Sequence, residues 1–308
     1  FSKEILIPNL LKLHKQTSID VLCVNKPISA LNLSKNYKNI EVLNDYKKVI
    51  KSKNIDIVFI STRHNLHFEL TIESLKRGKN VFCEKPMCIS KKELKYLDNF
   101  FSQKNNHKPI LVTGFNRRFS KSAQLMKEFI NSERIPIFLN YTVNAEKLEP
   151  DSWIYKNEGG GRNIGEACHF YDLILFLIND RCTEISACSI SNPKNSNFQK
   201  TDNFSVTLKF TNGSIAQLNY LSNGNKNDSK EIIEIRGANK TLFAHDFKII
   251  KIYEKDSEKV IYSSSKPSKG HYEQYEAFFN CLNNNKSSIS FEDQKNVMKI
   301  CFEVESKI

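Results

Sequence analysis

Residues 55–86 read IDIVFISTRHNLHFELTIESLKRGKNVFCEKP, and this stretch decides the fold. It opens with the apolar run Ile55 to Ile60, which indicates a buried strand, and it ends with a second short strand at Val81 to Cys83. Between them, apolar residues recur three or four positions apart, as on one face of a helix that ends at Gly78: Phe68, Ile72 and Leu75. A strand, a helix and a strand in this order predict a β-α-β unit with two parallel strands.

The flanking residues repeat this pattern. On the N-terminal side, Ile19 to Val24 (IDVLCV) predicts a buried strand that follows a helix with one apolar face: Leu6, Leu10 and Leu13. On the C-terminal side, a helix leads to a strand at Ile110 to Thr113, and its apolar face is Leu94, Leu97 and Phe101. We therefore expect an α/β domain with a parallel sheet over residues 1–118.

The pattern changes at about Phe119, where strands that alternate apolar and polar residues become frequent. After a helix at Ala123 to Ile130, the alternating residues Phe204 to Phe210 are followed by Asn212-Gly213, a strong hairpin signal. Further short strands are predicted at 215–220, 231–236, 249–253 and 259–262, and the polar stretches 191–203 and 222–229 are predicted as loops.

Two helices are predicted at the end of the chain. One has an apolar face formed by Tyr272, Tyr275, Phe279 and Leu282. The other starts at Ser290 with a capping box to Asp293. Residues 119–308 thus predict an α+β domain with a large, mostly antiparallel sheet.

Composition excludes several classes of protein. The chain of 308 residues is 40% hydrophobic, enough to form a core, and its longest apolar run, Leu173 to Ile178, is too short to span a membrane. The eight cysteines form no C-x-x-C pair, and the N-terminus does not read as a secretory signal, so we expect reduced thiols, no metal site and a cytoplasmic location. The net charge is +12, but 38 of the 46 basic residues are lysines spread over the chain, which favours a solvated surface over a nucleic-acid interface.

Polar residues gather directly after three of the predicted strands, at Ser61 to His67, Glu84 to Pro86 and Gly114 to Phe119. The carboxyl ends of parallel strands meet at one edge of the sheet, where ligands of α/β proteins bind. The sequence therefore predicts one binding crevice lined by these three segments.

The same segments carry a family resemblance. Gly78 to Pro86 (GKNVFCEKP) resembles the G-K-H-V-x-x-E-K-P signature of the Gfo/Idh/MocA oxidoreductases. Three further motifs follow the family order: Thr62 with His67 resembles T-P-x-x-x-H, Gly114 to Phe119 resembles G-F-N-R-R-F, and Gly159-Gly160-Gly161 with His169 and Asp172 resembles G-G-G…H-x-x-D.

This resemblance implies a Rossmann-type domain that binds NAD or NADP, and a second domain that binds substrate and whose open sheet often forms the dimer surface. It implies hydride transfer between the nicotinamide and a sugar, cyclitol or nucleotide-linked sugar, in a homo-oligomer (dimer or tetramer) without nucleic acid or membrane partners. Lys85 matches the catalytic lysine of the family and His169 its acid/base histidine. We expect further residues to bind the cofactor (Ser61, Thr62, His67, Glu84 and Asn116, together with Lys85) or the substrate (Arg117, Arg162 and Asp172).

The chemistry agrees with these roles. Oxidation of a secondary alcohol needs a base for the hydroxyl proton, and a cation beside the oxygen as its negative charge grows. His169 titrates near neutrality and suits the first task, and Lys85 suits the second. His169 is also compatible with a buried core position, because Leu173, Phe176 and Leu177 continue its helical face.

Other candidates keep more than one interpretation. Asp172, three residues after His169, is placed either to orient the imidazole, to bind a substrate hydroxyl, or in solvent. Four of the eight arginines lie in the motifs, where they either recognise a phosphate or carboxylate or form structural ion pairs: Arg63, Arg117, Arg118 and Arg162. Trp153 and Tyr155 either stack on a sugar or pack in the core.

The chain departs from the family pattern at three places. Gly165 stands four residues before His169, where many members have an aspartate that relays protons, and the neighbouring Glu166 points about 100° away on a helix. Phe1 begins where the Gly-rich phosphate loop would end, so we expect a fragment that lacks this loop. Asn25 and Lys26 replace the acidic residue that usually binds the ribose of NAD, which mildly favours NADP.

Three functional hypotheses follow. The first is an NAD(P)-dependent dehydrogenase or reductase that acts on CH–OH groups. The second is a non-catalytic member that binds a dinucleotide or sugar for regulation, which Gly165 and the missing loop suggest. The third, nucleic-acid binding, rests on charge alone.

Overall fold

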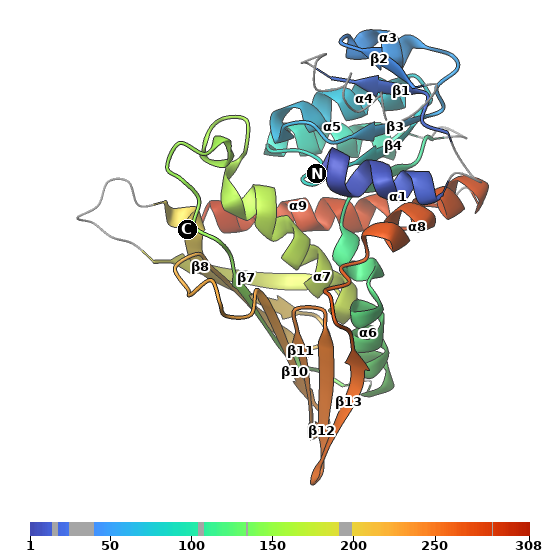
Figure 1. The fold of residues 1–308 in the computed structure, drawn as a ribbon. Coiled ribbons are helices and arrows are strands. Elements are labelled where there is room, and N and C mark those ends of the chain that lie inside the picture. The colour runs from blue at the N-terminus through green and yellow to red at the C-terminus, as the bar shows by residue number, and fades with distance from the viewer. Residues whose placement is uncertain (14–17, 25–39, 104–107, 134, 191–198, 285) are drawn as a thin grey trace.

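The structure is a computed structural model that describes residues 1–308 except 14–17, 25–39, 104–107, 134, 191–198 and 285. Two layers of sheet lie at opposite ends of the molecule, and helices pack between them (Figure 1). The predicted residues Asn25 and Lys26, and most of the predicted loop at 191–203, lie outside the described residues.

The N-terminal part is the predicted α/β unit. Its strands are all parallel, β1 with β2 in one pair and β3, β4 and β5 in order in a second sheet: β1 (Val21–Cys23), β2 (Glu41–Leu43), β3 (Ile57–Ile60), β4 (Asn80–Cys83) and β5 (Leu111–Thr113). The helices of this part are η1 (Ser2–Leu6), α1 (Ile7–Lys12), α3 (Tyr46–Lys51), η2 (His64–Leu66), α4 (His67–Lys76) and α5 (Lys91–Ser102). Helix α4 ends before Gly78, whose φ of 75° turns the chain back into β4.

The second part is built on an eight-stranded sheet. Its order is β13-β12-β11-β10-β6-β9-β8-β7, and β6 and β9 are its only parallel neighbours among the described residues. The strands are β6 (Phe138–Asn144), β7 (Cys182–Ser189), β8 (Asn203–Phe210), β9 (Ile215–Leu221), β10 (Glu231–Gly237), β11 (Lys240–His245), β12 (Ile249–Glu254) and β13 (Ser257–Ser263). The mostly antiparallel sheet and the β8–β9 hairpin at Asn212-Gly213 are confirmed.

Helices connect the two parts. They are η3 (Asn116–Phe119), α6 (Lys121–Glu133), η4 (Trp153–Tyr155), the π-helical turn η5 (Asn163–Ala167), α7 (Cys168–Ile178), η6 (Lys200–Asp202), α8 (His271–Asn284) and α9 (Phe291–Glu305). Helix α9 lies between the two parts and contacts α5 and β5 on one side and α7 and β7 on the other (Figure 1). The predicted domain boundary at 118/119 falls within η3 and stays a prediction.

Aromatic packing and one glutamine hold α8 and α9 against the parallel sheet. Phe59 on β3 and Phe82 on β4 contact the rings of Tyr275 and Phe278 on α8 at centroid distances of 5.0–6.1 Å. The buried Gln294 on α9 accepts hydrogen bonds from the backbone and hydroxyl of Thr113. These contacts fix the C-terminal helices beneath the strand ends that form the site.

The element predictions are incomplete in both parts of the chain. Strands β6, β7 and β11 were not predicted, nor were β2 and α3 in the first part. Ser290 caps α9 by accepting from the Asp293 amide at 3.0 Å, without the reciprocal bond of a full capping box. In the described part of the chain, each helix is too short or too polar to cross a membrane.

Candidate active site

One cavity lies at the carboxyl ends of the parallel strands, and residues of the second part of the chain also line it. Its volume is about 550 Å³. Nine of the ten predicted site residues line it: Ser61, Thr62, His67, Glu84, Lys85, Asn116, Arg117, Arg162 and His169. The predicted crevice therefore exists, and residues separated by more than 100 positions meet in it.

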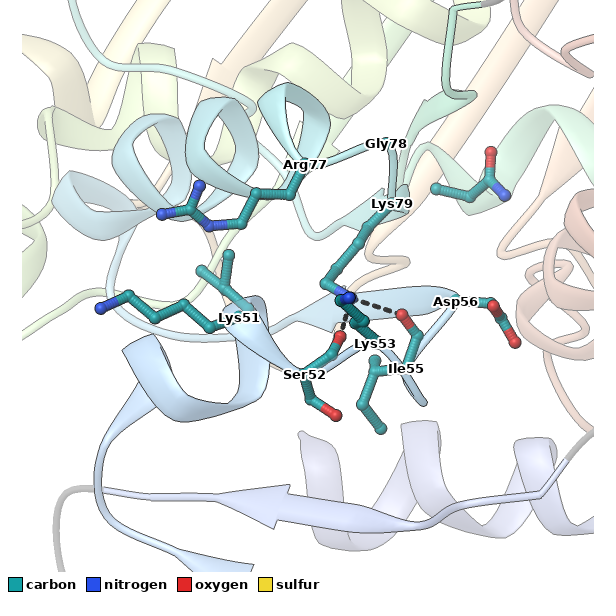
Figure 2. Close-up of a pocket in the computed structure, with 10 residues that line it drawn as sticks. Lys51, Ser52, Lys53, Ile55, Asp56, Arg77, Gly78 and Lys79 are labelled. Carbon is teal, nitrogen blue, oxygen red and sulfur yellow. Dashed lines mark hydrogen bonds between the residues drawn. The ribbon is translucent and has the colours of Figure 1, made fainter.

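A second cavity, of about 540 Å³, lies at the other edge of the same sheet. Lys79 precedes β4 there, and its Nζ donates to the carbonyls of Ser52 and Ile55 at 2.6 and 2.5 Å (Figure 2). This lysine thereby fixes the turn that leads into β3. Because ligands of open parallel sheets bind at the carboxyl ends of the strands, the first cavity is the candidate active site.

Lys85 directly follows β4 and crosses to the second part of the chain. Its half-buried ammonium Nζ donates to the carbonyl oxygen of Gly165 at 2.8 Å, and the peptide bond to Pro86 is cis. Gly165 lies in η5, and such single π-helical turns often occur at functional sites. The contact holds a cation against the start of α7, where His169 lies.

His169 is the second residue of α7 and faces the cavity. Its Nδ1 is buried and has no hydrogen-bond partner among the described residues. Burial lowers the pKa of His169 well below its ordinary value, and the positive charges of Arg117 and Lys85 lower it further. The imidazole is therefore neutral at pH 7, the form in which it can accept a proton.

Asp172 is placed elsewhere than expected. It is fully buried, it does not line the cavity, and both its oxygens accept from Arg118, Nε to Oδ2 at 2.9 Å and Nη2 to Oδ1. Burial raises the pKa of Asp172 to about 6 against the opposing effect of Arg118. The expected contacts of Asp172 with His169 or substrate are therefore not formed, and the pair instead ties η3 to α7.

Glu166 does not take the place of the missing aspartate. Its Oε2 accepts from the hydroxyl of Tyr220 and, at 3.1 Å, from Nη2 of Arg162. Arg162 also donates from Nη1 to the carbonyl of Glu146 at 2.7 Å, while its buried Nε has no partner among the described residues. The three side chains form one wall of the cavity, separate from the imidazole of His169.

A buried ion-pair network holds two further cavity residues, Arg117 and Lys269. Arg117 donates to both oxygens of Glu231, from Nε at 2.7 Å and from Nη2 at 2.8 Å, and Lys269 donates to the same carboxylate. The hydroxyl of Tyr141 adds a fourth hydrogen bond at 2.5 Å. Two cations thus share one carboxylate, and they hold the pKa of Glu231 well below its usual range although burial alone would raise it.

Three of the four arginines in the motifs therefore form ion pairs, which is one of the two roles that the sequence left open. The exception among the four in the motifs is Arg63, whose guanidinium lies 4.2 Å from the ring centre of Trp153. Trp153 lines the cavity, whereas the hydroxyl of Tyr155 donates to Asp202 at 2.6 Å.

Sequence reasoning did not single out three cavity residues. His64, Lys269 and His271 all line it, and Nε2 of His271 accepts from the Nδ2 amide group of Asn116 at 3.3 Å. His64 stood inside the first strand-end segment, but Lys269 lies just before α8 and His271 is the first residue of α8, and neither belongs to a motif. Their position depends on how α8 packs against η3.

Within the described ranges, no three His, Cys, Asp or Glu side chains are grouped to bind a metal ion.

Comparison with known proteins identifies the class. Two family models match, "Oxidoreductase family, NAD-binding Rossmann fold" over residues 3–110 and "Oxidoreductase family, C-terminal alpha/beta domain" over residues 130–291. The chain belongs to the Gfo/Idh/MocA family of oxidoreductases, and its N-terminal part is the NAD-binding domain of that family.

Individual relatives are more distant. A myo-inositol 2-dehydrogenase of Thermotoga maritima is 28% identical over 157 residues, 51% of this chain and 44% of the relative. A levoglucosan dehydrogenase of Pseudarthrobacter phenanthrenivorans is 27% identical over 144 residues, 44% of this chain and 36% of the relative. An uncharacterized oxidoreductase, YrbE of Bacillus subtilis, is 25% identical over 57% of this chain and 51% of its own length. The chain thus matches about half or less of the length of these relatives.

Solved structures share the whole fold. A dehydrogenase from Chromobacterium violaceum superposes with a TM-score of 0.83 at 17% identity, over 99% of this chain and 91% of that one. A levoglucosan dehydrogenase in complex with NADH and levoglucosan gives 0.79 at 20% identity, over 94% and 87% of the two chains.

The residues present fit the nicotinamide end of the cofactor. Glu84 is buried in the cavity wall, its Oε1 has no partner among the described residues, and burial raises its pKa to about 7. Gly114 leaves it room, because a Cβ there would lie 2.9 Å from the Glu84 oxygens. An unpaired buried oxygen of this kind is costly unless a ligand donor reaches it, and a carboxamide NH₂ is such a donor.

Proposed function

We propose that this protein is an NAD(P)-dependent dehydrogenase that oxidises a CH–OH group of a sugar or cyclitol. One observation carries the proposal: the Lys85 ammonium and the neutral His169 imidazole line the same cavity at the strand ends of the NAD-binding domain. The named relatives that act on myo-inositol and levoglucosan support a polyol as substrate.

The residues would divide the work as follows. His169 takes the hydroxyl proton at Nε2, because its Nδ1 is buried. Lys85, fixed by the Gly165 carbonyl, donates to the substrate oxygen and stabilises its growing negative charge. The nicotinamide, when bound, supplies the hydride acceptor. Arg117 and Arg162, held by their carboxylates, offer hydrogen-bond donors to the remaining hydroxyls.

The test has two steps and uses the whole protein. Trp153 is the single tryptophan of the sequence and lines the cavity, so its fluorescence reports NADH and NADPH binding directly and shows which is preferred. Steady-state oxidation of myo-inositol, levoglucosan and a panel of aldoses and uronates then follows the reduced nicotinamide.

Three variants separate the roles. Lys85→Met and His169→Gln should each lower kcat by about 100-fold or more, which is the usual range for loss of acid/base or electrostatic catalysis. Lys91→Met removes an exposed lysine at the start of α5 and should leave kcat unchanged. Near-normal turnover by Lys85→Met would refute its assigned role.

A second candidate is a non-catalytic family member that binds the dinucleotide or a sugar for regulation. It is favoured by His169 Nδ1, which has no carboxylate or carbonyl among the described residues to orient the ring. Tight NADH binding without turnover on the whole panel would support it over the dehydrogenase.

We also propose a homo-oligomer. Phe138 on β6 and Ile215 on β9 are paired in register and exposed on the face of the large sheet that is opposite its buried residues. Light scattering of the purified protein measures the oligomeric state, and a monomer at micromolar concentration would contradict this proposal.

A further inference from the structure

Gly165 leaves a space in the cavity wall that another residue fills. A Cβ at position 165 would lie 2.9 Å from Cε1 of His64 and 3.1 Å from its Nδ1. It would also lie 3.1 Å from the carbonyl oxygen of Gly159. Real carbon contacts are longer, so any side chain at 165 and the His64 imidazole exclude each other in this packing.

His64 is held firmly in this place. Its side chain is buried, its Nδ1 lies 2.7 Å from the Gly159 carbonyl oxygen, and its ring meets Trp153 edge-on at 4.7 Å between centroids. A carbonyl oxygen only accepts, so Nδ1 carries the ring proton and Nε2 is left with its lone pair. Burial and the nearby charge of Lys85 lower the pKa of His64 to about 3, which keeps this neutral form at pH 7.

The second nitrogen of His64 is available. Nε2 makes no hydrogen bond to any described residue, yet it is not among the buried unpaired atoms, and His64 lines the cavity. It is surrounded by two cations, a neutral imidazole and an indole ring: Arg63, Lys85, His67 and Trp153. An acceptor open to the cavity in such surroundings suits a ligand donor.

His64 and Lys85 also flank the same residue. Lys85 binds the carbonyl of Gly165, and the His64 ring packs against its Cα. Both side chains therefore meet at Gly165 and line the same cavity, in which the proposed polyol would bind.

We propose that His64 is a substrate-binding residue whose Nε2 accepts a hydrogen bond from a hydroxyl of the polyol, in the space that Gly165 leaves open. The inference rests on the proposed function. It makes Gly165 and His64 a matched pair, one from each part of the chain, that selects polyols with a hydroxyl adjacent to the reacting carbon.

Two substitutions at His64 test this. His64→Asn keeps a donor for Gly159 at the Nδ1 position but has no acceptor at the Nε2 position, and His64→Gln places an oxygen near Nε2. Loss of one hydrogen bond should raise KM for the best polyol of the panel by about 3- to 10-fold in His64→Asn, with recovery in His64→Gln. The kcat, and the Kd for NADH measured by Trp153 fluorescence, should stay within about twofold. His245→Asn, on strand β11 of the large sheet, is the matched control.

Gly165→Ala provides a second, independent variant. It should displace the imidazole and raise KM as His64→Asn does, and the double variant should be no worse than Gly165→Ala alone, because the two changes remove the same contact.

The outcomes separate the two proposals. An active parent whose His64→Asn variant keeps its KM overturns the inference alone. A variant that loses kcat, NADH affinity and thermal stability together, without rescue by glutamine, shows a structural role and also overturns it. A parent that oxidises no polyol of the panel refutes the proposed function, and the inference with it.

Discussion

Replacing Glu231 by glutamine tests whether the buried network beside the cavity is built as the structure has it. Glu231 is 1% exposed and accepts from Arg117 twice, from Tyr141 and from Lys269. A glutamine keeps one oxygen but turns an NH₂ group toward donors that need an acceptor. The positive charges of Arg117 and Lys269 then lose their counter-charge in a buried place.

The expected cost is large because the pair is broken on one side only. Removing one partner of a buried ion pair destabilises a protein by about 3–5 kcal/mol, mostly through the charge left behind. The same strand β10 carries a control: Glu234 pairs with Arg236, whose side chain is 59% exposed, and such a surface pair contributes about 1 kcal/mol or less. We therefore expect Glu231→Gln to lose several times more free energy of unfolding than Glu234→Gln.

Urea unfolding followed by circular dichroism at pH 7 measures both variants, and the pH dependence adds a second check. Since the folded-state pKa of Glu231 is lowered, its contribution is present above about pH 4.5, and it decreases as the pH falls below that value. Adding Arg117→Met to Glu231→Gln should recover part of the loss, because one of the two stranded charges is then gone and only that of Lys269 stays. A Glu231→Gln variant within about 1 kcal/mol of the parent would refute the reasoning.

Three further variants probe separate contacts. Gln294→Leu strands the Thr113 amide and hydroxyl in the core and should cost about 3 kcal/mol in urea unfolding; a loss below about 1 kcal/mol would contradict this. The pKa of Glu84 is raised to about 7, so the parent should become more stable by about 3 kcal/mol as the pH falls from about 7 to 4.5. Thermal melting across this pH range should show no such gain in Glu84→Gln. His271 has the opposite effect, because burial lowers its pKa to about 4 and only the unfolded chain takes up its proton below about pH 6.5. By about pH 5 the parent should therefore lose up to about 2 kcal/mol of its free energy of unfolding, and His271→Asn should not. An equal pH dependence of the two proteins would contradict the burial of His271.

The α/β part was predictable because its signals are local and strong. The runs at Ile57–Ile60 and Val81–Cys83 are apolar throughout, as strands covered on both faces require; the first is β3, and the second is β4 without its first residue, Asn80. Strand β7 was missed for the converse reason. It is an edge strand whose residues are at most half-buried, so its sequence, CTEISACS, carries little apolar pattern. Strand β6 does alternate, with Leu139, Tyr141 and Val143 buried, but its parallel partner β9 is far along the chain.

The sequence predicted which residues line the cavity, but it did not predict which of the charged side chains form ion pairs with one another. Strand-end positions and motifs brought Lys85, Glu84 and His169 to one cavity. The partners of the charged groups depend on how distant elements dock: Arg118 meets Asp172 after 54 residues, and Arg117 meets Glu231 after 114. The i, i+3 spacing of His169 and Asp172 shows the limit of local reasoning, because packing of η3 against α7 gives that carboxylate to Arg118 instead.

Gly165 shows why a departure from a family pattern has to be judged in three dimensions. Along the sequence it is the loss of a polar side chain four residues before His169, and Glu166 is the obvious substitute. In the structure Glu166 is committed to Arg162 and Tyr220, while the vacated volume is occupied by His64 from the other part of the chain. A cavity lined by two parts of the chain can therefore keep a polar side chain at one place in its wall although a different sequence position supplies it. The short distance from a Cβ at Gly165 to His64 reveals this replacement, which the spacing of the motif does not. The exchange alters the chemistry as well, since a neutral imidazole with a free Nε2 accepts one hydrogen bond and brings no negative charge to offset Lys85.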